Sequence, residues 1–179
     1  MTDTTEPGIS PFAGLLEQRV AASGEYLRKL ETSPFKESRI LRTAAGLVES
    51  GRFRQAAEET IVALARRGIG FEYLPKGHYS RGTKVRDGHE SLVLDEDFSN
   101  FTPVRKLSSL LHRNMSLILQ RRNMRGDLTS LRELLKMDVA LAEAVRLGTA
   151  KVIDINEKEI ALKEADAIEV EAKYKLASL

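Results

Sequence analysis

Apolar residues recur at spacings of three and four along most of this chain, and this period is the strongest constraint on its fold. The stripe Phe53, Ala56, Ala57, Thr60, Ile61 and Leu64 is one example. Side chains with that spacing share one face of an α-helix. We therefore predict a mainly α protein, whose helices cover residues 11–31, 34–49, 53–67, 103–124 and 128–147.

The starts of several helices are marked by a hydroxyl residue followed by proline. A hydroxyl side chain caps free backbone N–H groups, and proline suits the first helical position because it has no N–H to leave unpaired. Asp127, which follows Gly126, is a further cap candidate. The three dipeptides are Ser10-Pro11, Ser33-Pro34 and Thr102-Pro103.

Short connections join these helices in pairs. Gly51 separates the helices at 34–49 and 53–67, and a similarly short link follows the helix at 103–124. Helices joined by so few residues pack against each other as hairpins. The expected architecture is therefore a helical bundle of antiparallel hairpins.

The helical period stops between residues 69 and 101. Short apolar runs at 69–74 and 92–94 flank a stretch rich in glycine and cations, Tyr73 to Ser91. Short strands on either side of such a stretch favour a hairpin, and a structureless loop of this length inside a compact domain is uncommon. We predict a small β-hairpin or extended arm with a long tip, inserted into the helical domain.

The C-terminal residues fit two patterns. Apolar and charged residues alternate over 167–176, as in a strand, but Glu169–Lys173 and Glu171–Lys175 are helix-stabilising pairs. Alanine, glutamate, lysine and leucine, which favour helices, dominate the segment. We favour a helix over 157–176, with Asn156 as its N-cap. Its narrow apolar content suits the surface of a partner better than the core of this chain.

These patterns divide the chain into an N-terminal arm at 1–10, a helical domain at 11–149 with the inserted arm at 69–101, and an interaction tail at 150–179. The sequence has no cysteine and no apolar run long enough to span a membrane, and it starts with polar and acidic residues. We expect a protein without membrane contact, in the cytoplasm or in a particle assembled there.

Positive charge gathers in the middle of the chain, although the net charge is only +2. Flexible glycines and cations can follow a phosphate backbone, and the same cations can face an acidic protein surface. The predicted contact residues for nucleic acid or an acidic partner are Lys76, Arg81, Lys84, Arg86, Lys106, Arg113, Arg121, Arg122 and Arg125.

Aromatic and apolar residues of the arm and tail complete the predicted interface. These are Tyr73, Tyr79, Ile168, Val170, Tyr174 and Leu176. We predict a non-enzymatic structural protein, a homo-oligomer or a subunit of a larger assembly such as a virion, phage or nucleoprotein complex. The alternative is a nucleic-acid-binding module that grips phosphates through residues 76–86 and the basic helix at 105–125.

Catalysis and cofactor binding receive little support. The three histidines, His78, His89 and His112, match no catalytic pattern, and no phosphate-binding glycine motif is present. A metal-dependent enzyme built on His78, His89, Asp95 and Asp97 is the third alternative. Histidines and acids without metal-ligand spacing are usual on solvated turns, so we predict no catalytic residue, no metal and no cofactor.

Overall fold

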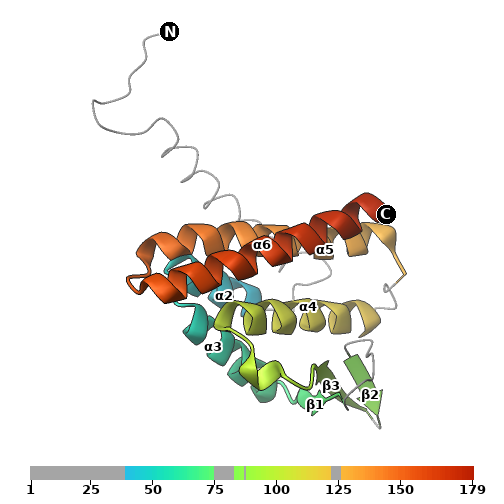
Figure 1. Ribbon diagram of the computed structural model, residues 1–179. Coiled ribbons are helices and arrows are strands. Elements are labelled where there is room, and N and C mark those ends of the chain that lie inside the picture. The colour runs from blue at the N-terminus through green and yellow to red at the C-terminus, as the bar shows by residue number, and fades with distance from the viewer. Residues whose placement is uncertain (1–38, 75–82, 87, 122–125) are drawn as a thin grey trace, which may run out of the picture.

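A computed structural model describes residues 39–74, 83–86, 88–121 and 126–179. The predicted arm at 1–10 and helix at 11–31 lie outside these residues. The described part is mainly helical, as predicted, with five helices and a small sheet (Figure 1). The elements are α2 (Arg39–Glu49), α3 (Phe53–Arg66), β1 (Gly70–Tyr73), β2 (Thr83–Arg86), β3 (His89–Leu94), α4 (Pro103–Arg121), α5 (Leu128–Gly148) and α6 (Ile155–Ser178), with 3₁₀ turns at Phe98–Asn100 and Thr149–Lys151. The arrangement as a bundle of antiparallel hairpins stays a prediction.

Three of the predicted caps lie within the described residues. Asp127 caps α5: its Oδ2 accepts hydrogen bonds from the Ser130 backbone N–H (3.2 Å) and hydroxyl (2.7 Å). Before α4, the Thr102 hydroxyl accepts a long bond of 3.4 Å from the Arg105 N–H. The predicted cap of α6, Asn156, is wrong. The backbone is still extended at Asp154, whose Oδ1 accepts from the Glu157 N–H at 3.0 Å, so Asn156 already lies in the first turn.

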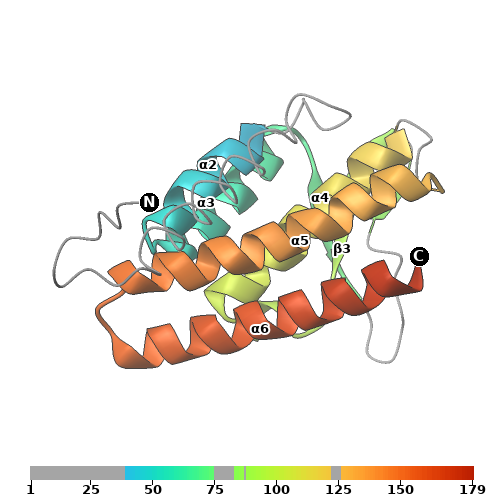
Figure 2. The same ribbon diagram turned by 90° about the horizontal axis from the view of Figure 1, so that it is seen from above.

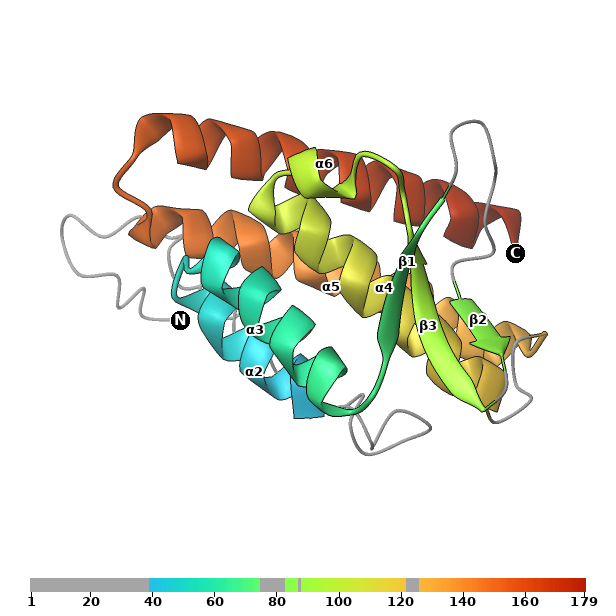
Figure 3. The same cartoon turned by 90° about the horizontal axis from the view of Figure 1, so that it is seen from below.

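The sheet corrects the predicted hairpin. Its strand order is β1-β3-β2, with β3 in the centre (Figure 3). β2 pairs antiparallel with β3, from Thr83 opposite Leu92 to Arg86 opposite His89. β1 pairs with β3 in parallel, so the two predicted strands are neighbours but do not form a hairpin. The reason is that β2, which the prediction left within the arm's tip, reverses the chain and takes the antiparallel edge of β3.

Two glycines allow the end of α5 to approach the turn between α2 and α3. Gly51 has a φ of +73°, a conformation that other residues rarely adopt. A Cβ on Gly148 would lie 2.1 Å from the carbonyl oxygen of Val48, and one on Gly51 would lie 2.7 Å from the carbonyl oxygen of Gly148. Both positions therefore require glycine for this close backbone contact.

Helix α4 forms the centre of the core. It contacts α3, α5, α6 and β3, and it lies between the α5–α6 pair and the sheet (Figure 1). Leu107, Leu110, Leu111 and Leu117 of α4 have no exposed surface. α5 in turn lies between the α2–α3 pair and α6 (Figure 2). α4 and α5 are therefore the helices against which α6 packs.

Candidate functional site

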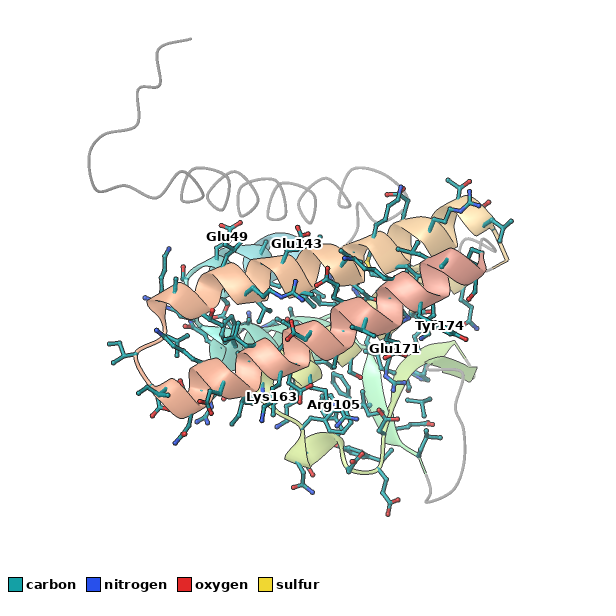
Figure 4. The ribbon with its side chains drawn as sticks, turned by 45° about the horizontal axis from the view of Figure 1, so that its top comes forward. Glu49, Arg105, Glu143, Lys163, Glu171 and Tyr174 are labelled. Atoms are coloured by element: carbon teal, nitrogen blue, oxygen red, sulfur yellow. The ribbon has the colours of Figure 1, made fainter. Side chains whose placement is uncertain are left out.

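A groove of about 710 Å³ separates α4 from α6, with α5 at its floor. α4 lines it with Arg105, His112, Arg113 and three serines, and α6 lines it with acids, a lysine and small apolar residues. Leu135 of α5 adds an apolar floor. The walls therefore offer charges of both signs together with hydroxyl groups. In Figure 4, Arg105 lies close to the edge of α6 that carries Glu171.

The deepest polar contact of the groove joins α4 to α5. His112 Nδ1 lies 2.8 Å from Asp138 Oδ2, and Asp138 is 93% buried, since only 7% of its surface is exposed. Its other oxygen, Oδ1, has no hydrogen-bond partner among the described residues. The contact fixes the orientation of the His112 ring, with Nδ1 facing Asp138. This contact was not predicted from the sequence, because Asp138 lies among the apolar residues of the helix at 128–147.

Arg113, one of the predicted partner contacts, is held within the chain. Its guanidinium donates to the Val93 carbonyl oxygen (2.5 Å), to Asp95 Oδ2 (3.2 Å) and to the Ser109 hydroxyl (3.0 Å). Only 16% of its side chain is exposed. The residue therefore ties α4 to the end of β3, and its charge is balanced there by Asp95.

Two other predicted cations of α4 also have partners in this chain. Arg121 forms an ion pair with Glu90 of β3. The Lys106 ammonium lies 5.9 Å from the centre of the Phe98 ring. Arg105, which was not among the predicted contacts, stacks on Phe101 with its guanidinium carbon 3.8 Å from the ring centre. Most of the described cations of α4 thus serve contacts within the fold.

The α6 wall of the groove contains an ion pair of its own. Lys175 lies 2.8 Å from Glu171 Oε1. Its hydrogen bond is the main cause that lowers the pKa of Glu171, against partial burial, and the charges of Lys175, His112 and Arg105 lower it further. The Glu171 carboxylate therefore stays ionised in the groove at neutral pH.

A second group of charges fixes α6 to α5. Arg146 donates to Asp166 Oδ1 at 2.8 and 3.1 Å and also contacts Glu169. Lys173 lies 2.6 Å from Glu169 Oε1. The hydrogen bond from Lys173, joined by those of Arg146, lowers the pKa of Glu169 more than burial raises it. The α5–α6 contact thus depends on ion pairs as well as on small apolar residues.

The face of α6 that points away from this contact is partly apolar. We define the outer seam as six exposed residues spaced three, four, three, four and three apart: Ile160, Lys163, Ala167, Val170, Tyr174 and Ala177. Val170 is 69% exposed, Tyr174 75% and Ile160 44%. Lys163 and Tyr174 lie along the edge of α6 that is remote from α5 (Figure 4). The spacing is that of a helix-pairing seam.

The predicted interface residues fall into three groups. Val170 and Tyr174 are exposed on the outer seam, and Tyr73 is 59% exposed at the end of β1. Ile168 packs against the core instead, and Leu176 is half-buried, because both turn toward the inner side of α6. Lys84 and Arg86 lie in β2, where only the backbone is described. The remaining predicted residues lie outside the described ranges: Lys76, Tyr79, Arg81, Arg122 and Arg125.

The described residues place no three His, Asp or Glu side chains where they can hold a metal ion. His78, which the metal alternative needs, lies outside these residues. Within the same part of the chain, no helix is long and apolar enough to cross a membrane.

Comparison with known proteins gave no match: no family model, no curated protein and no solved structure is similar to this chain. A functional proposal therefore depends on the geometry described above.

Proposed function

We propose that the protein is a non-enzymatic assembly subunit, a helical bundle of antiparallel hairpins that joins an oligomeric complex through α6. The outer seam is the observation that carries this proposal. Its three large members, Ile160, Val170 and Tyr174, are 44%, 69% and 75% exposed on a helix that packs against α5. Full burial of a large apolar side chain stabilises by about 1.5–3 kcal/mol, so burial of these three against a partner favours association.

The composition of the inner side of α6 supports the same proposal. The buried residues of α6 are three alanines, Ala161, Ala165 and Ala172. A helix whose only function was to cover the core would turn its larger apolar residues inward. α6 instead buries only alanines fully, leaves Ile168 and Leu176 half-buried on its inner side, and turns Val170 and Tyr174 outward. This distribution is typical of a helix with a second partner.

The groove between α4 and α6 fits a structural role in this proposal. Its main charges pair with each other, as His112 does with Asp138, Arg113 with Asp95, and Lys175 with Glu171. The first pair joins α4 to α5, the second joins α4 to the end of β3, and the third lies within α6. Arg146 of α5 holds α6 through Asp166 and Glu169, and α6 can then present the outer seam to a partner.

Nucleic-acid binding is the weaker alternative. It depends on cations of the basic helix, of which Arg113 and Arg121 already form ion pairs with Asp95 and Glu90. A phosphate would have to compete with these acids. The alternative now depends mainly on residues 76–86.

The proposal is tested by the mass of the purified chain in light scattering, with the ratio of absorbance at 260 and 280 nm read over the same peak. We expect an oligomer free of nucleic acid. Val170→Glu places a charge on the outer seam and is expected to weaken association at least tenfold. Val62→Glu is the matched control, because Val62 is 47% exposed on α3, away from α6. A monomer at every concentration contradicts the proposal, and a peak that carries nucleic acid removable by salt favours the alternative.

A further inference from the structure

We infer that the partner of the outer seam is a second copy of this chain, whose α6 lies antiparallel to the first. This inference rests on the proposed assembly function and names its partner. It concerns residues 155–178 of α6, and the contact with α5 determines which face of this helix points outward.

The seam is complementary to itself in size when two copies run antiparallel. A two-fold axis between residues 168 and 169 brings Ile160 opposite the partner's Ala177 and Ala167 opposite the partner's Val170. In these two pairs a large side chain meets a small one, and each pair occurs twice because a two-fold interface is isologous. Large residues facing small ones allow two helices to interdigitate without voids.

The third pair of the seam, which contains a charged residue, also favours the antiparallel arrangement. Lys163 lies opposite the partner's Tyr174, and an ammonium over a tyrosine ring is an attractive contact. On one flank, Asp166 comes level with the partner's Lys173, which adds a small attraction between opposite charges, reduced because Arg146 already pairs with Asp166 and Glu169 with Lys173. On the other flank, Glu164 approaches the partner's Glu171. That repulsion is reduced because Lys175 already neutralises Glu171 at 2.8 Å.

The parallel arrangement is less favourable on the same residues. In register, it places Lys163 beside the partner's Lys163 and Asp166 near the partner's Glu171. Like charges then meet both in the seam and on its flank. Ala167 also faces the partner's Ala167, which leaves a gap beside the larger Val170. The antiparallel pairing avoids both defects.

The chain has no cysteine, so engineered disulfides report the pairing without background. The test mixes a Lys163→Cys chain with a Tyr174→Cys chain that carries a different tag, under mild oxidation. Antiparallel pairing brings these two positions face to face, within the Cα separation of about 4.4–6.8 Å that a disulfide needs. We expect the mixed crosslink to form at least tenfold faster than either chain crosslinks with itself.

The control mixes Leu162→Cys with Tyr174→Cys. Residue 162 lies at nearly the same height on the helix as 163 but is turned about 100° away from it. We expect this mixture to crosslink at the slow rate of a random collision. Because all three positions are exposed, these substitutions should leave the fold intact, and the thermal unfolding temperature of each variant verifies this.

The outcomes separate this inference from the proposed function. Rapid crosslinking of Lys163→Cys with itself, as parallel pairing requires, overturns the antiparallel inference and leaves the assembly function standing. An oligomer in light scattering without any rapid crosslink overturns the inference too, because the interface then lies elsewhere on the chain. A monomer in light scattering contradicts the proposed function itself.

Discussion

Helices α4 and α6 line the same groove but are stabilised in different ways. α4, with 19 residues, buries nine of them, most of which are large apolar side chains. α6 is longer, with 24 residues, yet it buries only three alanines. Its position depends instead on close packing against α5 and on ion pairs such as Arg146 with Asp166. The comparison shows how one fold can contain a helix that builds the core and a helix that presents a surface.

This difference has a consequence for how each helix responds to change. Removing apolar volume should affect α4 strongly and exposed positions of α6 outside the outer seam hardly at all. Adding volume on the inner side of α6, or removing the ion pairs that hold it, should lower the stability of the fold. The same changes at exposed positions should have little effect. Three experiments test this contrast, in order of expected effect.

The largest effect is expected from Leu110→Ala in α4. Leu110 has no exposed surface, so truncation loses transfer free energy and leaves a cavity that costs about 2–5 kcal/mol in total. For a chain of this size, that lowers the unfolding temperature by roughly 5–15 °C. Leu162→Ala, at an exposed position of α6 outside the outer seam, is the matched change and should stay within about 0.5 kcal/mol. Calorimetry of both variants measures the contrast, and equal losses would show that the two helices do not differ in this way.

A smaller effect is expected from Ala165→Leu, on the inner side of α6. Ala165 has no exposed surface, and a larger side chain there must push α6 away from its neighbours. Overpacking of this kind costs about 1–3 kcal/mol. Ala65→Leu on an exposed position of α3 serves as the control and should change stability by less than about 0.5 kcal/mol. Chemical denaturation measures both, and unchanged stability of Ala165→Leu would mean that α6 is only loosely attached.

The smallest effect concerns pH and the ion pairs of α6. Because the pKa of Glu169 is lowered in the folded chain, its stabilising contribution is complete above the ordinary glutamate pKa. It is lost as the pH falls through the lowered pKa. The unfolding temperature should therefore fall on acidification below about pH 4.5.

Glu169→Gln removes this carboxylate and should remove part of that acid dependence, with a loss at neutral pH of about 1–3 °C in unfolding temperature. Glu157→Gln, at an exposed position at the start of α6, is the control. A pH profile of unfolding that is identical for wild type and Glu169→Gln would show that these ion pairs do not help to hold α6.

Local sequence signals determined much of the helical part of this fold. The apolar stripe of α3 from Phe53 to Leu64 is buried as its spacing indicates, except for half-buried Ile61. α4 starts at Pro103, and Asp127 caps α5. In the C-terminal segment, both Glu169–Lys173 and Glu171–Lys175 form ion pairs along a helix. Such signals act over one or two helical turns, so their result can be predicted without knowledge of the rest of the chain.

Tertiary structure alone decided which distant groups meet. The parallel pairing of β1 with β3 depends on where β2 lies, and the contact of His112 with Asp138 joins positions 26 residues apart. Arg113 is a third example: we predicted from the sequence that it contacts a partner, but in the fold it pairs with Asp95 of the same chain. A single sequence records the charge and size of each side chain but not its neighbours. Those neighbours follow from the packing of α4 between its partners, because close packing permits only a few arrangements of helices and sheet.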